Sequence, residues 1–292
     1  MSPVDVSSFI TDFATADPLP GALRPDRPYY DTGVLLDAED FADEQTYHRA
    51  RLARALGYLG GDGTLVGLKT RITRTGGVLE WQVGGGLALD RFGRLIEVPR
   101  AWCVRLERWV AAQSDDALRA ANGPAGVVAD VFLRFAAQGR GRTPAFAQGA
   151  FDATDALVPS RVRDAFVLEP VLRPDAAADP TALAHLPRHR FADLRALPPA
   201  ARVDGARQAL LDAWDTRLAR PDGEALQPRS EHPPGLDPAS IFLARLTLPV
   251  SGVDATTSRP LIDFDAVDDS RLNNTARTFV MPTDMLGAIF GA

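Results

Sequence analysis

Cysteine and long apolar runs are scarce in this 292-residue sequence. The single cysteine, Cys103, excludes an internal disulfide and a metal site built from several cysteines. No apolar run approaches the roughly 20 residues that a helix needs to cross a bilayer. The N-terminal segment has neither a basic start nor a continuous apolar stretch, so it does not predict a secretory signal. We therefore expect synthesis in the cytoplasm and no membrane among the partners.

Basic charge is also in short supply. Lysine and arginine together number 32 against 38 acidic residues, which gives a net charge of -6, and Lys69 is the one lysine. A protein that binds a phosphate backbone usually carries a basic surface patch, so this charge balance argues against a nucleic-acid partner. An apolar content of 46% is ordinary for a protein with a buried core. The 23 prolines and 24 glycines favour many turns and short strands.

The clearest helical pattern covers residues 37–57 and opens with a cluster of carboxylates. Asp37 is a good N-cap, and acidic residues in the first turns complement the positive end of the helix dipole. We favour this interpretation over an acid/base or metal site. Phe41, His48 and Leu52 recur on one side, together with Leu56, and predict the side that packs on the core. On that side His48 is expected to be a packed, hydrogen-bonded core histidine.

A β-rich region follows the predicted helix. Residues 68–73 and 79–83 alternate between apolar and polar on either side of Gly76-Gly77, the pattern of a half-buried hairpin. A second turn, near 91–93, separates two more short strands. Further strands are expected at 103–107, 127–136, 162–172, 241–250 and 261–267, and Cys103 is expected to be a buried small residue.

The predicted fold class is mainly β with α (α+β): a compact β-sandwich or barrel-like core, one long N-terminal helix packed on it, and extended terminal arms. Prolines punctuate the first 28 residues, and the last 14 are strongly apolar. The predicted division is 1–28 as an extended N-terminal arm, 29–172 as a helix plus β-rich core domain, 173–240 as a Pro/Ala-rich insertion with one amphipathic helix, 241–278 as returning strands, and 279–292 as an apolar C-terminal arm.

Candidate chemical motifs are weak throughout the chain. His185 and His189 have metal-ligand spacing, but Pro187 lies between them and no HExxH glutamate is present. The acidic run 263–269 lacks the glycine and terminal glutamate of an EF-hand loop, which leaves a weak calcium site open. The glycine-rich run 83–93 precedes a strand and not a helix, so it does not predict a phosphate cradle. We therefore expect no enzyme activity, no cofactor and no metal.

The order of several segments resembles a known family. The pattern begins Y-x-D-x-x-x-x-L-x-A-E-D-F-x-x-E-Q-x-Y, continues through G-x-x-x-G-L and G-x-A-L-D-x-x-G-R-x-I-x-V, and ends in a strand resembling S-R-I-R-E-x-F. In this chain it reads YYDTGVLLDAEDFADEQTY (29–47), GTLVGL (63–68), GLALDRFGRLIEV (86–98) and SRVRDAF (160–166). The sequence is similar there to baseplate or tail-tip accessory proteins of tailed bacteriophages and of phage-tail-like contractile injection systems.

The resemblance implies a non-enzymatic structural component, made in the host cytoplasm and incorporated in a virion tail or an injection particle. Its implied partners are other baseplate or tail subunits and further copies of itself in a three- or six-fold setting. Arms of this kind can add a strand to a neighbour's sheet, although both could instead fold back on their own core. The residues expected at assembly interfaces are Phe9, Ile10, Phe13, Phe279, Met281, Leu286 and Phe290.

Two other functions remain open from the residues. A receptor- or glycan-binding module at the tail periphery is the first, and exposed Trp102 or Trp109 would favour it. Trp81 is a weaker candidate because strand alternation places it in the core. A wall-degrading hydrolase is the second, and it would require two carboxylates lining a deep cleft.

Overall fold

The computed structural model describes residues 17, 19, 25–141, 143–145, 156–181, 194, 196–217, 226–275 and 277–281. The helices of this part are α2 (Ala38–Gly60), α3 (Leu106–Ala111), α4 (Asp115–Ala120) and α5 (Arg202–Arg217). The strands are β1 (Gly63–Gly67), β2 (Thr70–Thr75), β3 (Val78–Val83), β4 (Gly86–Leu89), β5 (Leu95–Val98), β6 (Trp102–Arg105), β7 (Asn122–Gly123), β8 (Gly126–Arg140), β9 (Thr143–Ala145), β10 (Ala156–Val158), β11 (Arg161–Leu172), β12 (Ile241–Leu248), β13 (Val250–Val253), β14 (Pro260–Ile262) and β15 (Leu272–Asn273).

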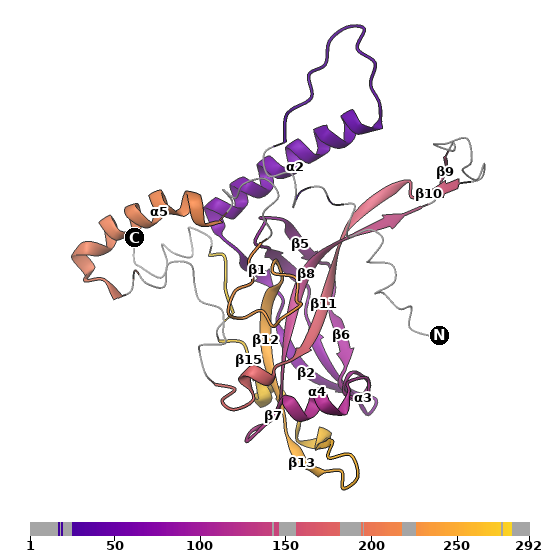
Figure 1. Ribbon diagram of the computed structural model, residues 1–292, viewed down its shortest axis with the longest axis vertical. Helices are drawn as coiled ribbons and strands as arrows, with labels where there is room; N and C mark the ends of the chain where they lie inside the picture. Colours follow the sequence, from indigo (N-terminus) through magenta and orange to yellow (C-terminus); the bar gives the residue numbers. More distant parts are fainter. Residues whose placement is uncertain are drawn as a thin grey trace.

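The largest sheet has the order β11-β8-β12-β15, with β7 paired to β8. All of its pairs are antiparallel, and β8 and β11 pair along the whole of β11. Figure 1 shows these two strands running as a long ribbon past the other sheets toward β9 and β10. Residues 126–133 of β8 are all buried, because both faces of the sheet are covered there.

Two three-stranded sheets, β1-β4-β5 and β2-β3-β6, complete the body. The predicted hairpin is confirmed: β2 and β3 pair from Thr70↔Val83 to Thr75↔Val78 around the turn at Gly76-Gly77. The second predicted turn is confirmed as well, since β4 and β5 pair on either side of it. The period-2 pattern placed β2 and β3, and the turn near 91–93 placed β4 and β5.

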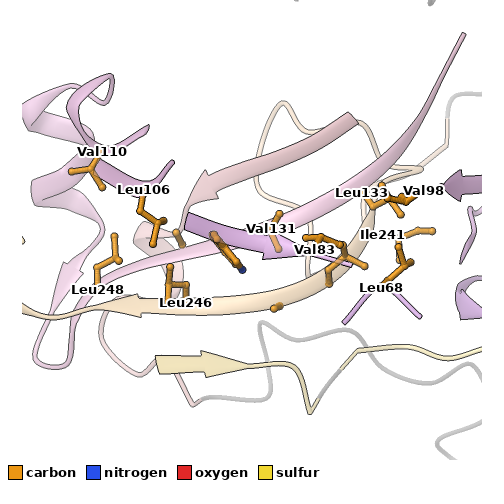
Figure 2. Close-up of a cluster of buried hydrophobic side chains, with 14 of the residues drawn as sticks. Leu68, Val83, Val98, Leu106, Val110, Val131, Leu133, Ile241, Leu246 and Leu248 are labelled. Carbon is orange, nitrogen blue, oxygen red and sulfur yellow. The ribbon is translucent and has the colours of Figure 1, made fainter. Parts of the chain in front are cut away.

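The core lies between the large sheet and the two smaller sheets. Trp81 and Val83 from β3, Ile96 from β5, and the inward residues of β8 and β12 belong to one buried cluster. Figure 2 shows the cluster extending along the sheets, with Leu68, Leu133 and Ile241 together at one end and Leu106, Leu246 and Leu248 at the other. The predicted fold class, mainly β with α and a sheet-on-sheet core, is confirmed. None of the sheets formed by the described residues closes into a barrel.

The outer face of the large sheet is covered by residues 226–240, which precede β12. Phe132 and Phe242 project from this face and pack with Leu236. Both ends of the predicted 173–240 insertion are therefore close to the core, since Arg173 and Ala239 are also buried. The division of the chain into five segments stays a prediction.

The burial predicted for Cys103 was wrong. Cys103 is exposed, because it pairs with Gln82 on β3 while its neighbour Val104 pairs with the core residue Trp81. Adjacent strand residues point to opposite faces, so the register places Cys103 outside. Partial burial and a hydrogen bond with Glu80 raise the pKa of its thiol.

Candidate functional site

The acidic stretch that opens α2 serves the start of the helix. The Asp37 carboxylate accepts hydrogen bonds from the Glu39 and Asp40 N–H groups at 2.8 and 3.2 Å. Asp40 in turn accepts from the Asp37 N–H at 2.9 Å, which completes a capping box. Farther along, Glu44 accepts from the Tyr30 hydroxyl at 3.0 Å. These carboxylates hold the helix start in place.

The inward side of α2 consists of small residues. Thr46, Ala50, Ala53 and Gly57 are its buried positions. The β4–β5 turn comes so close that a Cβ on Gly93 would lie 1.8 Å from the Ala53 carbonyl oxygen. Large side chains on this side would hold the helix away from the turn. The helix does pack on the body as predicted, but through a different side.

The larger apolar side chains of α2 face solvent. Phe41 is 50% exposed, Leu52 is 62% exposed and Leu59 is 88% exposed. The prediction that Phe41 and Leu52 mark the packed side was therefore wrong. The prediction of a core position for His48 was also wrong, because its side chain is 68% exposed. Helical periodicity located an apolar stripe but could not say what covers it.

The segment before α2 extends this apolar surface. Tyr29, Val34, Leu35 and Leu36 are all exposed, with Leu35 at 94%. These residues belong to the same block, 29–47, that carries the family resemblance. We refer to Tyr29–Leu36 together with the exposed apolar residues of α2 as the α2 surface. Figure 1 shows α2 along one edge of the molecule, with its N-terminal end directed away from the sheets.

A pocket of about 220 Å³ lies beside the α2 surface. Leu52 and Leu56 of α2 form one wall, and Leu95 and Phe135 form another. Arg94 and Asp164 add polar groups to the lining. The Arg94 guanidinium lies 4.5 Å from the centre of the Phe135 ring, within the range of a cation–π contact. This pocket has the size to take one or two side chains.

Buried ion pairs fix the walls of the pocket. Arg94 bonds Asp90 at 2.6 Å and Asp17 at 2.9 Å. Asp17 also pairs with Arg49 of α2 at 3.1 Å, and Leu19 is buried nearby. Burial opposes the charge on Arg94, but Asp90 and Asp17 outweigh it and raise the pKa of the guanidinium. This described part of the N-terminal arm is therefore tied to the chain's own body.

The predicted C-terminal interface is partly described. Phe279 and Met281 are exposed at 43% and 39%, whereas Val280 between them is buried. The Val280 N–H donates to the Thr64 carbonyl, and the Thr64 N–H donates to the Thr278 carbonyl, both at 2.9 Å. The start of the C-terminal segment thus lies beside β1. The other predicted assembly residues, Phe9, Ile10, Phe13, Leu286 and Phe290, lie outside the described residues, as do His185 and His189.

Arg277 anchors the same segment. It donates to the carbonyls of Leu243 and Leu68, each at 2.7 Å, and to the Thr70 hydroxyl at 3.3 Å. These acceptors are neutral, and burial of the guanidinium lowers its pKa to about 10. It therefore remains charged at neutral pH and ties the C-terminal segment to β12 and β2.

A buried charge cluster spans the outer face of the large sheet. Asp130 bonds Arg173 at 2.5 Å and Arg245 at 2.7 and 2.9 Å. Arg173 also bonds Asp175, and although burial opposes its charge, Asp175 and Asp130 raise its pKa. All three central side chains are 0–1% exposed. This cluster is enclosed and its charges are mutually paired, so it links β8 and β12 to the segment after β11 and offers no access to a substrate.

His232 is enclosed in the segment that covers Phe132. Its Nε2 lies 2.9 Å from the Ser240 carbonyl, and its Nδ1 accepts from the Arg229 N–H at 3.0 Å. Its ring stacks on Phe132 with the ring centroids 5.9 Å apart. Each ring nitrogen thus has a hydrogen-bond partner that suits the neutral imidazole. Burial lowers the pKa of this side chain.

The acidic run 263–269 serves short turns. Asp263 accepts from the N–H groups of Asp265 and Ala266, and Asp268 accepts from Ser270. Asp269 accepts from the Ile72 N–H at 2.6 Å and joins this loop to β2. Within the described ranges, no group of three or more His, Cys, Asp or Glu side chains could hold a metal ion.

The tryptophans differ in exposure. Trp81 is 1% exposed, whereas Trp102 is 45% exposed. The Trp102 ring meets Phe166 edge to face at 5.8 Å. Trp109 is half-buried against the core. The expectation that alternation places Trp81 in the core is confirmed, and Trp102 is the exposed aromatic among the three.

The comparisons with known proteins add no relative. No protein-family model matches the sequence, and no curated protein matches it. Within the described part of the chain, every helix is too short or too polar to cross a membrane.

Proposed function

We propose that the protein is a non-enzymatic structural component of a phage tail or contractile injection system, positioned at the baseplate or tail tip. Its partners in this proposal are neighbouring tail subunits and further copies of itself. It is made in the host cytoplasm and carried in the particle.

The exposure of the α2 surface carries this proposal. The block that resembles the tail-protein family, 29–47, has apolar side chains that do not hold its own fold together. Leu35 and Phe41, at 94% and 50% exposure, are examples. An apolar patch that a monomer leaves in water is characteristic of a protein–protein contact surface. Contact with another subunit therefore explains both the composition of this block and its position.

The terminal segments support the same function in a more limited way. Asp17 and Leu19 at one end, and Arg277 and Val280 at the other, are anchored on the body. Such anchors would direct the residues beyond them from fixed points. In this proposal Phe279 and Met281, together with Phe9, Ile10, Phe13, Leu286 and Phe290, contact neighbouring subunits.

Genetic complementation tests the proposal. In the strain that encodes the chain, the gene is deleted and replaced by the wild-type gene or a variant, and tail particles are purified. We expect the wild-type protein at a fixed ratio to the tube protein and an antibody label at one end of the particle. Absence of the protein from intact particles would contradict the proposal.

Matched variants separate assembly from folding. The double variant Leu35→Ser with Phe41→Ser should reduce incorporation at least ~10-fold, because it removes apolar contact area from the interface. The control Val203→Ser changes a similarly exposed residue on α5, 60% exposed, and should incorporate normally. Deleting 282–292 while keeping Val280 tests the C-terminal arm without removing its anchor.

A glycan- or receptor-binding module is the second candidate, favoured by the exposed Trp102 beside Phe166. Aromatic faces of this kind can stack on sugar rings. Binding on a glycan array that is lost in Trp102→Ala and kept in Leu210→Ala would promote this function. The hydrolase gains no support from the pocket beside α2, because among the described residues that line it Asp164 is the one carboxylate.

A further inference from the structure

The exposed side of α2 follows a seven-residue repeat. Its members alternate at intervals of three and four residues, and every one of them is exposed. Apolar residues at this spacing form the seam of a coiled coil, whose two kinds of seam position are called a and d. The a positions are Ala38, Gln45, Leu52 and Leu59, and the d positions are Phe41, His48 and Ala55.

The packing on the body places this seam opposite the side that is already covered. The buried residues Thr46, Ala53, Ala50 and Gly57 occupy the b and f positions of the same repeat. These positions lie across the helix from a and d. The body therefore covers the back of α2 and leaves its whole seam free for a partner helix.

The charges on α2 indicate what that partner is. Beside the seam, at g positions, the first half carries Glu44 and the second half carries Arg51. Two copies of α2 running antiparallel would place each acidic half against a basic half. Their helix dipoles would also oppose each other favourably. A parallel pair would place the acidic starts together.

The ion pairs of the subunit also favour the antiparallel direction. In a parallel pair, Glu44 would face Arg49 of the second copy, since these positions flank the seam five residues apart. Arg49 is already paired with Asp17 at 3.1 Å. In the antiparallel pair, Glu44 instead faces Arg51, which is exposed on the same flank of the seam.

We propose that two copies of this chain pair through an antiparallel coiled coil of their α2 helices about a two-fold axis. In this register Phe41 of each copy lies over Leu52 of the other, and Gln45 lies opposite His48. The overlap from Ala38 to Ala55 is about 27 Å long. Polar residues at two central layers favour one register over its neighbours, because any shift would place an amide or imidazole against an apolar residue.

The pocket beside α2 gives the pairing a second contact. Leu52 belongs both to the seam and to the pocket wall. Phe41 of the second copy, placed over Leu52, would lie at the mouth of this pocket, opposite Phe135. Beyond the overlap, Leu59 of each copy continues the seam past the start of the other helix. The pairing thus covers Phe41 and Leu52, the central apolar residues of the helical part of the α2 surface.

Sedimentation of the full chain tests the pairing first. We expect a dimer at micromolar concentration and at least ~30-fold weaker dimerisation in Leu52→Glu, equivalent to about 2 kcal/mol, because a charge would enter the seam twice. Leu210→Glu is the matched control, since Leu210 is 59% exposed on α5 and should remain dimeric. A wild-type monomer, or an equal effect of the two variants, would overturn the proposal. Circular dichroism confirms that each variant is folded.

Charge reversal tests the direction and register. Glu44→Arg and Arg51→Glu should each weaken the dimer, because each places like charges across the two-fold axis twice. The double variant should recover at least half of the loss in binding free energy. No recovery in the double variant would rule out the Glu44–Arg51 contact and with it this register.

Cysteine cross-linking gives a direct readout of geometry. The exposed Cys103 is first replaced by Ser. In that background Phe41→Cys combined with Leu52→Cys should form an intermolecular disulfide, and Leu52→Cys alone should not. Efficient self-cross-linking of Leu52→Cys would show a parallel pair and overturn the proposal.

Dimerisation through α2 does not depend on incorporation of the protein into a tail particle. Loss of the dimer in Leu52→Glu together with normal incorporation into particles would confirm the coiled coil and limit its role in assembly. Dimerisation of a chain that is absent from particles would contradict the proposed function alone.

Discussion

Two aromatic residues, Trp81 in β3 and Phe41 in α2, lie in equally regular apolar patterns but in opposite environments. Trp81 is 1% exposed at the centre of the core, and Phe41 is 50% exposed on the α2 surface. In β3, the large residues Leu79, Trp81 and Val83 are buried, and Glu80 and Gln82 between them are less buried. In α2, the small residues Ala50 and Ala53 are inside and the large residues are outside.

This difference teaches what each kind of pattern can establish. Alternation in a strand belongs to a sheet whose other strands come from the same chain, so the apolar face is covered within the subunit. A helical stripe requires only some apolar partner, and that partner can be a second molecule. An inverted helix, with its small residues packed and its large ones free, is therefore a sign of assembly.

The largest expected effect on stability comes from a substitution in the β core. Trp81→Ala should lower the free energy of unfolding by about 3–5 kcal/mol, because it leaves a cavity between the sheets. Urea denaturation followed by far-ultraviolet circular dichroism measures this change. A loss below about 1 kcal/mol would mean that Trp81 is not a central packing residue.

A second substitution, at Gly93, disrupts the contact between the β4–β5 turn and α2. Gly93→Ala should cost about 3 kcal/mol, because its Cβ would overlap the Ala53 carbonyl oxygen at 1.8 Å. The matched control is Gly76→Ala, which shares the positive φ but has no atom within 4 Å of the added Cβ. That control should cost about 1 kcal/mol from backbone strain alone. Equal losses would show that close packing of α2 on the turn contributes nothing.

The buried His232 should make the stability of the β body depend on pH. Its pKa is lowered in the folded state, so the unfolded state binds more protons as the pH falls past the usual value of about 6.5. Stability should therefore be complete above pH 7 and decrease between pH 7 and 5. Asp268, whose pKa is lowered by hydrogen bonds from Ser270, contributes only in more acidic solution.

Comparison with His232→Gln measures this contribution. The unfolding free energy of the variant should depend less on pH between 7 and 5 than that of the wild type. His48→Gln is the matched control, because it makes the same substitution at an exposed histidine outside the segment that encloses His232. Identical profiles for wild type and His232→Gln would contradict the assignment.

The smallest expected effect comes from the exposed side of α2. Phe41→Ala should change the unfolding free energy of the monomer by no more than about 0.5 kcal/mol, as expected for a surface position. The measurement belongs at nanomolar concentration, because dimerisation would add to the apparent stability. A loss comparable with that of Trp81→Ala would show that Phe41 supports its own subunit.

Much of the local structure could be predicted from the sequence. The β2–β3 hairpin was placed correctly because its alternation and its glycine turn are both local signals. The N-cap at Asp37 was also predicted from a local signal, because an acidic residue stands directly before the helix. The return contact from Asp40, which completes the capping box, was not predicted. Cys103 was misplaced because its orientation depends on the register of β6 against β3.

The candidate site was less accessible from the sequence. Spacing identified Phe41, His48 and Leu52 as one side of a helix, but it assigned that side to the core. The seven-residue interval between Leu52 and Leu59 was the available signal, since a heptad repeat predicts a helical partner. The pocket could not have been found, because Leu52 and Phe135 are brought together by the fold alone.

The sequence by itself determined the elements: where the strands turn, where α2 begins and which of its residues form a stripe. Only the tertiary structure decided which side of α2 meets the body. The close approach of the β4–β5 turn admits Ala53 and leaves no room for a large side chain at that position. Local patterns follow from neighbours in the chain, whereas the covered side of a helix depends on the space left by residues far away in sequence.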